Sequence, residues 1–283
     1  SYATPRITSV ATVSLNTWTH IAVVRSGSTT TLYINGTSSG TPYSSSATFN
    51  AGAGYIGAYP GLGSYYHSGY MSNARLVNGT AIVPPSGGPT SPLTAVTNTK
   101  FLTCQSSTLI DNANNNVVIT AATDTIKPLT VSPFTPTASS PTNYSKSTFG
   151  GSIYFDGTGD TLTIPSAQAT NLSLGSGDFT IECWFYRTSD PANYHVLFGG
   201  SNIAGTLGAN TNTQFTVSTA GAVNAVSRAQ RGSVGKRAGE KNERHGPRSK
   251  SSKSLFTSRC KLSKGLQLCK AIPFCSDFLS STL

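Results

Sequence analysis

The sequence lacks long apolar runs and a helical hydrophobic period, and each absence excludes a class of protein. No stretch approaches the ~18 consecutive apolar residues of a membrane-spanning helix, so we expect no membrane span. Before residue 226 no apolar spacing matches a helical face, which excludes a helical bundle. Cysteine is also sparse there, and two isolated residues, Cys104 and Cys183, do not make a disulfide framework. Cys183 lies in an apolar segment and is expected to be a small buried hydrophobe.

The net charge of +10 comes entirely from residues 227–283. Residues 1–226 contain seven basic and seven acidic side chains, whereas residues 227–283 contain thirteen basic and three acidic ones. Arg228 to Lys253 is rich in Lys, Arg, Gly and Ser, a composition typical of disorder. Two interpretations follow: a basic tail that binds nucleic acid through phosphates, or the product of a changed reading frame. We therefore expect a nucleic-acid partner only if this tail is genuine.

The clearest structural signal is an apolar hairpin over residues 18–36. Ile21 and Val23 face one side of the first strand, and Ala22 and Val24 face the other, so both sides should be covered. Small residues then form a loop, and Asn35-Gly36 is a strong turn signal. Further strands are predicted at 54–57, 69–77, 99–104, 117–121, 152–155, 161–164, 179–186, 195–198 and 213–218.

Several of these segments resemble laminin-G-like modules of the concanavalin A-like lectin/glucanase superfamily. The first half carries Trp-Thr-His-Ile-Ala-Val-Val-Arg (18–25), Leu-Tyr-Ile-Asn-Gly (32–36) and Gly-Tyr-Met-Ser-Asn-Ala-Arg-Leu-Val (69–77). The second half carries Tyr-Phe-Asp-Gly-Thr-Gly-Asp-Thr-Leu-Thr-Ile-Pro (154–165) and Gly-Asp-Phe-Thr-Ile-Glu-Cys-Trp-Phe-Tyr (177–186). The resemblance implies an all-β, antiparallel jelly-roll β-sandwich. The segment between the halves is similar to spacers between tandem modules in structural proteins of marine tailed phages.

The order of the halves differs from the family, in which the second set of motifs comes first. We therefore expect a circularly permuted or split sandwich, cut as a fragment from a longer product. Residues 1–83 would be the C-terminal half of a module, and 84–148 a Pro/Ser/Thr-rich spacer with two short strands. Residues 149–226 would be the N-terminal half and pack on 1–83, because neither half alone covers its apolar face. Residues 227–283 would be the disordered or out-of-frame tail.

One glycine-rich loop gathers the candidate ligand-binding residues Tyr59, Tyr65, Tyr66 and His67. Aromatic rings with polar tips stack on sugar faces and also form hydrogen bonds, although the same residues could merely fill an edge loop. With the family resemblance, this loop predicts a non-catalytic glycan-binding or adhesion module. Its expected partner is a cell-surface glycan or a neighbouring structural protein, and its expected location is a virion surface or the extracellular space.

Catalytic and metal-binding signals are weak. A glycoside hydrolase of the same superfamily is the alternative, but it needs two carboxylates, and Glu182 is alone on its strand. Strands 152–155 and 161–164 flank residues 156–160 and predict a hairpin. Asp156 and Asp160, on either side of its Gly-Thr-Gly loop, are a weak Ca²⁺ candidate, although a turn alone explains them. His20 and His195 keep no metal-ligand spacing. A Ser-His-Asp arrangement stays open, but no nucleophile elbow is present. We expect no enzyme and no cofactor.

Overall fold

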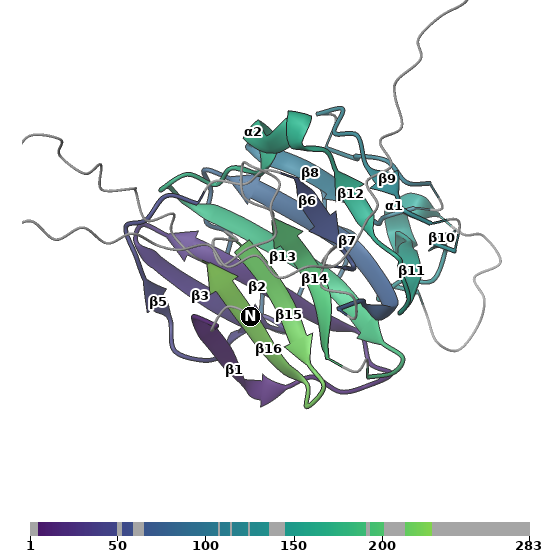
Figure 1. The fold of residues 1–283 in the computed structure, drawn as a ribbon, viewed down its shortest axis with the longest axis horizontal. Coiled ribbons are helices and arrows are strands. Elements are labelled where there is room, and N and C mark those ends of the chain that lie inside the picture. The colour runs from purple at the N-terminus through teal and green to yellow at the C-terminus, as the bar shows by residue number, and fades with distance from the viewer. Residues whose placement is uncertain are drawn as a thin grey trace, which may run out of the picture. The chain divides into compact units, whose positions relative to one another are not determined.

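Two antiparallel β-sheets pack face to face in the computed structural model (Figure 1). It describes residues 5–49, 53–58, 65–106, 108–113, 115–123, 125–135, 145–190, 193–200 and 213–227. The only helical elements in these ranges are short turns: α1 (Lys146–Phe149), η1 (Ser166–Gln168) and α2 (Ala169–Leu172). The predicted all-β sandwich is therefore confirmed. The basic tail from residue 228 onward lies outside the described residues.

The first sheet has seven strands. Their spatial order is β1 (Ile7–Thr12), β16 (Ala222–Ser227), β15 (Thr213–Ser218), β14 (Tyr194–Gly200), β6 (Gly54–Ile56), β12 (Leu162–Ile164) and β9 (Thr120–Ala121). The late strands β16, β15 and β14 thus lie between β1 and β6, which come from the beginning of the chain. In particular, β6 pairs with both β14 and β12 through Ile56.

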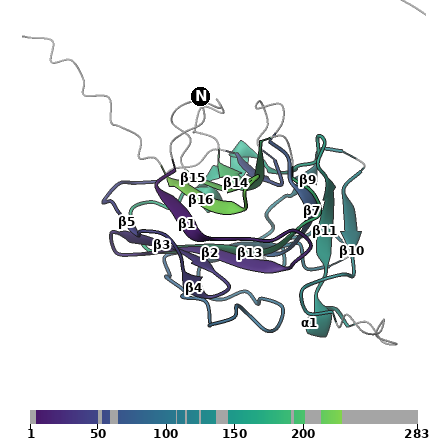
Figure 2. The same ribbon diagram turned by 90° about the horizontal axis from the view of Figure 1, so that it is seen from below.

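The second sheet has nine strands. The main order is β10 (Lys127–Leu129), β11 (Ser152–Asp156), β7 (Ser68–Asn78), β13 (Phe179–Arg187), β2 (Thr19–Ser26), β3 (Thr29–Ile34) and β4 (Thr37–Ser38). In addition, β5 (Tyr43–Ser44) pairs with β3, and β8 (Thr99–Thr103) pairs with the second half of β7. In Figure 2 this sheet runs along the bottom through β3, β2 and β13 and turns upward through β7, β11 and β10.

Strand β13 lies between β2 and β7, so the two segments that carry the family motifs share one sheet. Glu182 of β13 pairs with Ala22 of β2 on one side and with Arg75 of β7 on the other. At the opposite layer, β1 pairs with β16 through Ile7 and Ala225. Each segment therefore supplies hydrogen-bonding edges that the other completes, and neither forms a sheet of its own.

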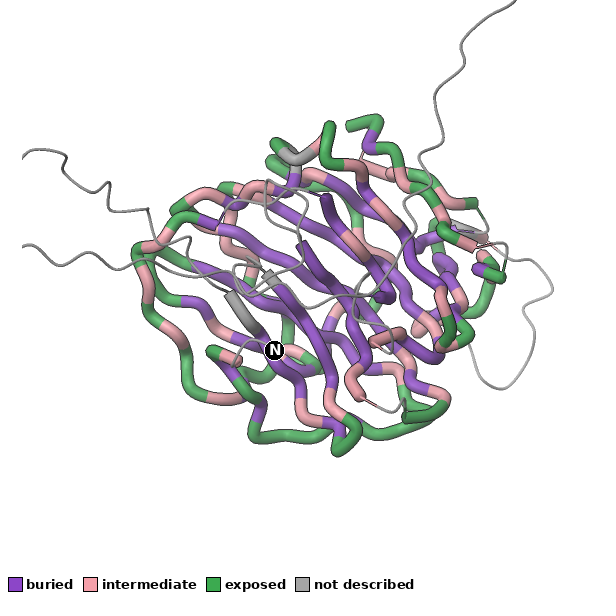
Figure 3. Tube along the Cα trace, viewed as in Figure 1, coloured by how far each residue is buried: buried purple, intermediate pink, exposed green. Residues whose placement is uncertain are grey.

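Alternate residues of the strands build the core between the sheets. Ile21, Val23, Ile181 and Phe185 point inward from the second sheet, and all are buried. Cys183 has the same orientation, and burial raises the pKa of its thiol well above the ordinary value. β-Branched and aromatic residues fill this space because they fit the pleated surface. Figure 3 shows the buried residues along the strands and the exposed ones in the connecting loops.

The outer face of the second sheet is covered over much of its area, as the apolar residues on both sides of β2 predicted. The spacer provides this cover. The chain between residues 79 and 98 forms no strand, but it packs closely against the sheet. A Cβ at Gly88 would lie 3.0 Å from His20 Cβ and 3.1 Å from Trp184 Cζ2. Leu93 donates its backbone N–H to Asn73 of β7 at 2.7 Å. The spacer is therefore part of the packed structure.

Local turn signals were right at one place and misleading at another. Residues 19–34 form the expected hairpin, and Asn35 and Gly36 both have positive φ angles, 48° and 74°, as in a type I′ turn. Segments 152–156 and 162–164 are not a hairpin, however. Strand β11 belongs to the second sheet and β12 to the first, so the loop at Asp156–Asp160 crosses between the layers.

Candidate functional site

The described part of the predicted aromatic loop, residues 65–67, lies at the end of the sandwich where β7 and β14 begin. Tyr65 stacks on Tyr194 of β14, with ring centroids 6.0 Å apart and planes only 7° from parallel. Tyr65, Tyr66 and Tyr194 are all partly exposed, whereas Tyr59 lies outside the described residues. Tyr194 was missed from the sequence, since its only signal was its place immediately before a predicted strand. Two segments far apart in the chain thus supply one parallel pair of rings.

His67 was expected to belong to this loop surface but is fully buried. Its ring meets the edges of Phe155 and Phe185, and its Nε2 lies 3.3 Å from the Tyr70 carbonyl oxygen. Burial, followed by the neighbouring His195, lowers its pKa well below the ordinary value. Strand β7 starts at the next residue, so His67 already points into the core. It supports the loop from inside and does not face a ligand at the surface.

His195 lies beside His67, with ring centroids 5.2 Å apart, and is also fully buried. Burial and the charge of Arg187 lower its pKa to about 3, so the imidazole is neutral. Its Nδ1 accepts a hydrogen bond from the backbone N–H of Ser68 at 3.4 Å. Asp190 Oδ1 lies 3.7 Å from its Nε2. These contacts place a serine, a histidine and an aspartate together.

The arrangement lacks the hydrogen bond that a nucleophilic serine needs. The Ser68 hydroxyl hydrogen-bonds with the hydroxyls of Thr188, at 3.1 Å, and Ser189, at 2.9 Å. Asp190 accepts a hydrogen bond from the buried Arg187 guanidinium at 2.6 Å. General-base activation requires the imidazole to take the hydroxyl proton, and here it accepts a backbone amide instead. The cluster is therefore organised as structural support at this end of the sandwich.

Glu182, the carboxylate considered for hydrolysis, lies under the spacer and is only 2% exposed. It accepts hydrogen bonds from Arg75 Nε at 2.9 Å and Nη2 at 2.5 Å, and its other oxygen lies 3.1 Å from His20 Nε2. Burial tends to raise its pKa, but the hydrogen bond from His20 and the charge of Arg75 outweigh burial, so the pKa is lowered. A carboxylate held ionised and buried in this way cannot donate a proton to a glycosidic oxygen.

The carboxylates of Asp156 and Asp160 accept hydrogen bonds within the loop that crosses between the sheets. Asp160 is buried, and it accepts hydrogen bonds from the hydroxyls of Thr123 and Thr125 and from the backbone N–H of Asp156. Asp156 accepts the Thr158 N–H at 2.7 Å. Hydrogen-bond donors already surround the Asp160 carboxylate, so this pair does not fit a Ca²⁺ site of six to eight oxygens. Within the described ranges no three His, Cys, Asp or Glu residues cluster as metal ligands.

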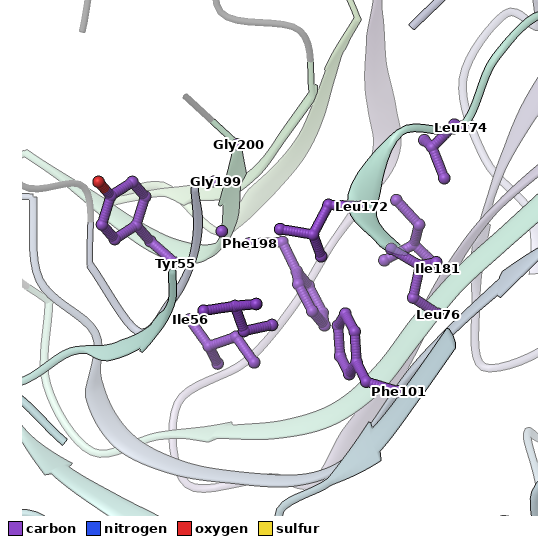
Figure 4. Close-up of a pocket in the computed structure, with 12 residues that line it drawn as sticks. Tyr55, Ile56, Leu76, Phe101, Leu172, Leu174, Ile181, Phe198, Gly199 and Gly200 are labelled. Atoms are coloured by element: carbon purple, nitrogen blue, oxygen red, sulfur yellow. The ribbon is translucent and has the colours of Figure 1, made fainter. Parts of the chain in front are cut away.

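A small apolar cavity lies between the sheets (Figure 4). Its volume is about 40 Å³, and its lining includes Ile56, Leu76, Phe101, Leu172 and Phe198. Such a volume holds only a few water-sized groups, and an apolar lining does not attract polar ones. It is a packing gap in the core.

A larger cleft of about 450 Å³ lies along the spacer. Its lining residues are Pro92, Leu93, Thr94, Gln105, Ser145 and Ser147. The Gln105 amide already donates to Asn73 Oδ1 and to the Leu93 carbonyl oxygen, both at 2.6 Å. None of its lining residues in the described part of the chain is aromatic. The stacked pair Tyr65–Tyr194 is therefore better suited to a sugar than this cleft.

Comparison with known proteins finds a family match for the first part of the chain. Residues 1–82 match the family model described as the concanavalin A-like lectin/glucanases superfamily. No curated protein and no solved structure matches the chain. The resemblance read from the motifs of the first segment is thus confirmed, and with it a lectin-like β-sandwich. No helix within the described ranges is long and apolar enough to cross a membrane.

Proposed function

We propose that this chain is a non-catalytic glycan-binding module that serves adhesion in a virion or extracellular structural protein. The match of its first residues to the lectin/glucanase superfamily is the starting point, because that superfamily supplies carbohydrate-binding modules. Fold alone does not assign function, so the proposal rests on a site. That site is the stacked pair Tyr65 and Tyr194 at one end of the sandwich.

The parallel stack is the observation that carries the proposal. Two phenol rings, 6.0 Å apart and nearly parallel, form a rigid and partly exposed aromatic edge. Rings of this kind pack against the apolar face of a pyranose, and phenol hydroxyls form hydrogen bonds of the kind that sugars offer. Tyr66 is the next residue along and is also partly exposed. Loops on a rigid sandwich are where binding residues commonly gather.

Binding without cleavage is favoured by the place of Glu182. A glycosidase needs one carboxylic acid and one carboxylate facing the same bond. Glu182 is buried, is paired with Arg75 and His20, and is covered by the spacer. The chain therefore offers a sugar no acid–base pair at this position.

The wider setting follows from the spacer and from charge. The spacer is similar to those between tandem modules of marine phage structural proteins, which favours a repeated adhesive role on a virion. The even balance of charges over residues 1–226 favours a neutral surface glycan or a neighbouring structural protein as the partner.

The test is a glycan array probed with the full chain and with two variants, Tyr65→Ala and Tyr194→Ala. We expect the wild-type chain to bind a defined subset of glycans and both variants to lose most of that signal. Tyr33→Ala, which removes a similarly half-buried tyrosine from β3, is the matched control and should bind normally. Absence of any glycan signal for the wild type, or equal signals for all four proteins, would refute the proposal.

A further inference from the structure

Each tyrosine of the stacked pair is joined through the backbone to a buried histidine. His67 follows Tyr65 by two residues, and His195 follows Tyr194 directly. Both histidines are fully buried, and their ring centroids are 5.2 Å apart. The tyrosine stack and the histidine pair thus belong to the same two segments, at the starts of β7 and β14. Displacement of either imidazole therefore moves a ring of the stack.

The hydrogen bonds fix which nitrogen of each imidazole carries the proton. His195 Nδ1 accepts the backbone N–H of Ser68 at 3.4 Å, so its proton is on Nε2. His67 Nε2 lies 3.3 Å from the carbonyl oxygen of Tyr70, which only accepts, so here too the proton is on Nε2. The other two nitrogens, His67 Nδ1 and His195 Nε2, are buried without a hydrogen-bond partner among the described residues. Both rings are therefore organised as neutral imidazoles.

A second proton on either ring conflicts with these contacts. An imidazolium carries an N–H on both nitrogens, so His195 Nδ1 could no longer accept the N–H of Ser68, and two donors would face each other. That hydrogen bond joins the first residue of β7 to β14. At His67 the new N–H would be at Nδ1, where no described residue accepts it. Buried donors and charges without partners disfavour the folded arrangement.

The nearby charges oppose protonation as well. Burial lowers the pKa of both histidines, and the charge of the buried Arg187 at the end of β13 adds to this effect. Asp190 Oδ1 lies 3.7 Å from His195 Nε2, but it already accepts a hydrogen bond from Arg187 at 2.6 Å. One carboxylate would then have to neutralise two cations.

The other elements around the histidine pair are apolar or already paired. Phe155 of β11 and Phe185 of β13 present their ring edges to His67. The neighbours of β14 in its sheet, β6 and β15, contain no charged residue. Asp156 of β11 is exposed, and Asp160 is held by threonine hydroxyls. The tyrosines at this end stay neutral in acid, because phenols ionise near pH 10.

We propose that the histidine pair is an acid switch: protonation of either imidazole opens the end of the sandwich where β7 and β14 begin and separates Tyr65 from Tyr194. Opening lets water solvate the imidazolium, and only the first residues of two strands have to leave their partners. The inference rests on the proposed glycan-binding function and adds its regulation, with binding at neutral pH and release in acid. Histidine is the side chain whose ordinary charge change falls in that range.

The first test measures opening without a sugar. Hydrogen–deuterium exchange of the full chain, corrected for the intrinsic effect of pH, is compared at about pH 7.5 and about pH 5 in peptides covering residues 65–70 and 193–198. The pKa of His195 is about 3 when folded and about 6.5 when solvated, so His195 alone predicts about 30-fold more opening at the lower pH. Strand β3 lies beyond β13 and β2 from β7, so it is the internal reference and should change little.

The variants replace each histidine by an amide that takes up no proton. In His195→Asn the side-chain oxygen lies close to the place of Nδ1, and in His67→Gln the amide keeps an N–H near the place of Nε2. We expect each single variant to respond less than wild type, and the double variant to change less than about threefold between the two pH values. Asp156→Asn removes the exposed carboxylate opposite Ser68 and is the matched control, which should respond as wild type does. Thermal melting shows which variants are folded, and the single variants carry the test if the double variant is not.

The second test probes the same glycan array at both pH values. Apparent affinity falls with the fraction of closed protein, so the wild type should lose most of its signal at about pH 5, and the double variant should keep it. Exchange that does not respond to acid, that responds equally in the variants, or that rises in β3 as well overturns the switch and leaves the proposed function standing. Equal array signals at the two pH values also overturn the switch. No glycan signal at either pH overturns the proposed function, and the exchange then still decides whether the histidine pair opens.

Discussion

Replacing Glu182 by Gln should destabilise the protein by several kcal/mol, although this residue touches no proposed ligand site. Glu182 neutralises Arg75, which is 5% exposed, and hydrogen-bonds to the fully buried His20. Glutamine keeps the shape and one accepting oxygen, but it removes the negative charge and turns a donor toward one of these two partners. Arg75 would then be a buried cation without a counter-charge, and its acceptors would be the Thr94 carbonyl oxygen and the single glutamine oxygen.

The magnitude follows from the hydrogen bonds that are lost. Glu182 accepts two from Arg75, and each hydrogen bond to a charged group contributes about 1.5–3 kcal/mol. Leaving one member of a buried ion pair unpaired costs about 3–5 kcal/mol in general. One acceptor survives in glutamine, so we expect a loss of about 3 kcal/mol. Typical domains are stable by about 5–15 kcal/mol, so such a loss is a large fraction of the total.

Denaturant unfolding followed by tryptophan fluorescence measures this change well, because Trp184 packs against His20 in the same network, with ring centroids 5.3 Å apart. Asp156→Asn is the control: Asp156 is exposed, and asparagine keeps the oxygen that caps Thr158, so its effect should stay within about 0.5 kcal/mol. The double variant Glu182→Leu/Arg75→Met should recover much of the loss, since it removes both charges. A loss below about 1 kcal/mol for Glu182→Gln would refute the reasoning.

Three further predictions concern acid, backbone and thiols. The pKa of His195 is lowered to about 3 in the folded protein. As the pH drops below 6.5, His195 is therefore protonated in the unfolded chain but not in the folded one, and stability falls. Between pH 6.5 and about 4.5 His195 should cost roughly 2–3 kcal/mol, and His195→Gln should flatten the pH dependence of Tm. Gly69→Ala should lower the free energy of unfolding by more than about 2 kcal/mol, since φ is +136° and the new Cβ would lie 1.9 Å from the backbone carbonyl oxygen of Tyr186. Gly27→Ala, with φ +58° and open space, should cost about 1 kcal/mol in the same melts. Burial raises the pKa of Cys104 to about 12, so peptide mapping after alkylation should find it labelled only in denaturant.

Much of the fold was predictable because its strands are specified locally. Alternation of apolar residues along β2 and β13, and the turn at Asn35-Gly36, were read correctly from neighbouring residues. The hairpin predicted around Asp156 was wrong for a physical reason. An Asp-Gly turn reverses the chain equally well within one sheet or between two, and only the available partners, β7 and β6, decide which.

The candidate sites were predictable only in part. Tyr65 and Tyr66, two of the candidate residues, are partly exposed, but their neighbour His67 points into the core because β7 starts immediately after it. The stack of Tyr65 on Tyr194 had no signal in the sequence, because the two rings come from segments 129 residues apart. Period-two alternation puts Tyr186 and Trp184 on the same face, but it does not show where the spacer stops covering that face.

Local chemistry by itself determined that this chain forms strands, where its main turns fall, and which side of each strand is apolar. Those properties depend on interactions within a few residues. The tertiary structure decided that β13 enters between β2 and β7, that the spacer packs on one sheet face, and that Tyr65 and Tyr194 from distant segments stack on each other. These arrangements depend on hydrogen bonding and burial between residues far apart in the chain, so no short stretch of the sequence encodes them alone.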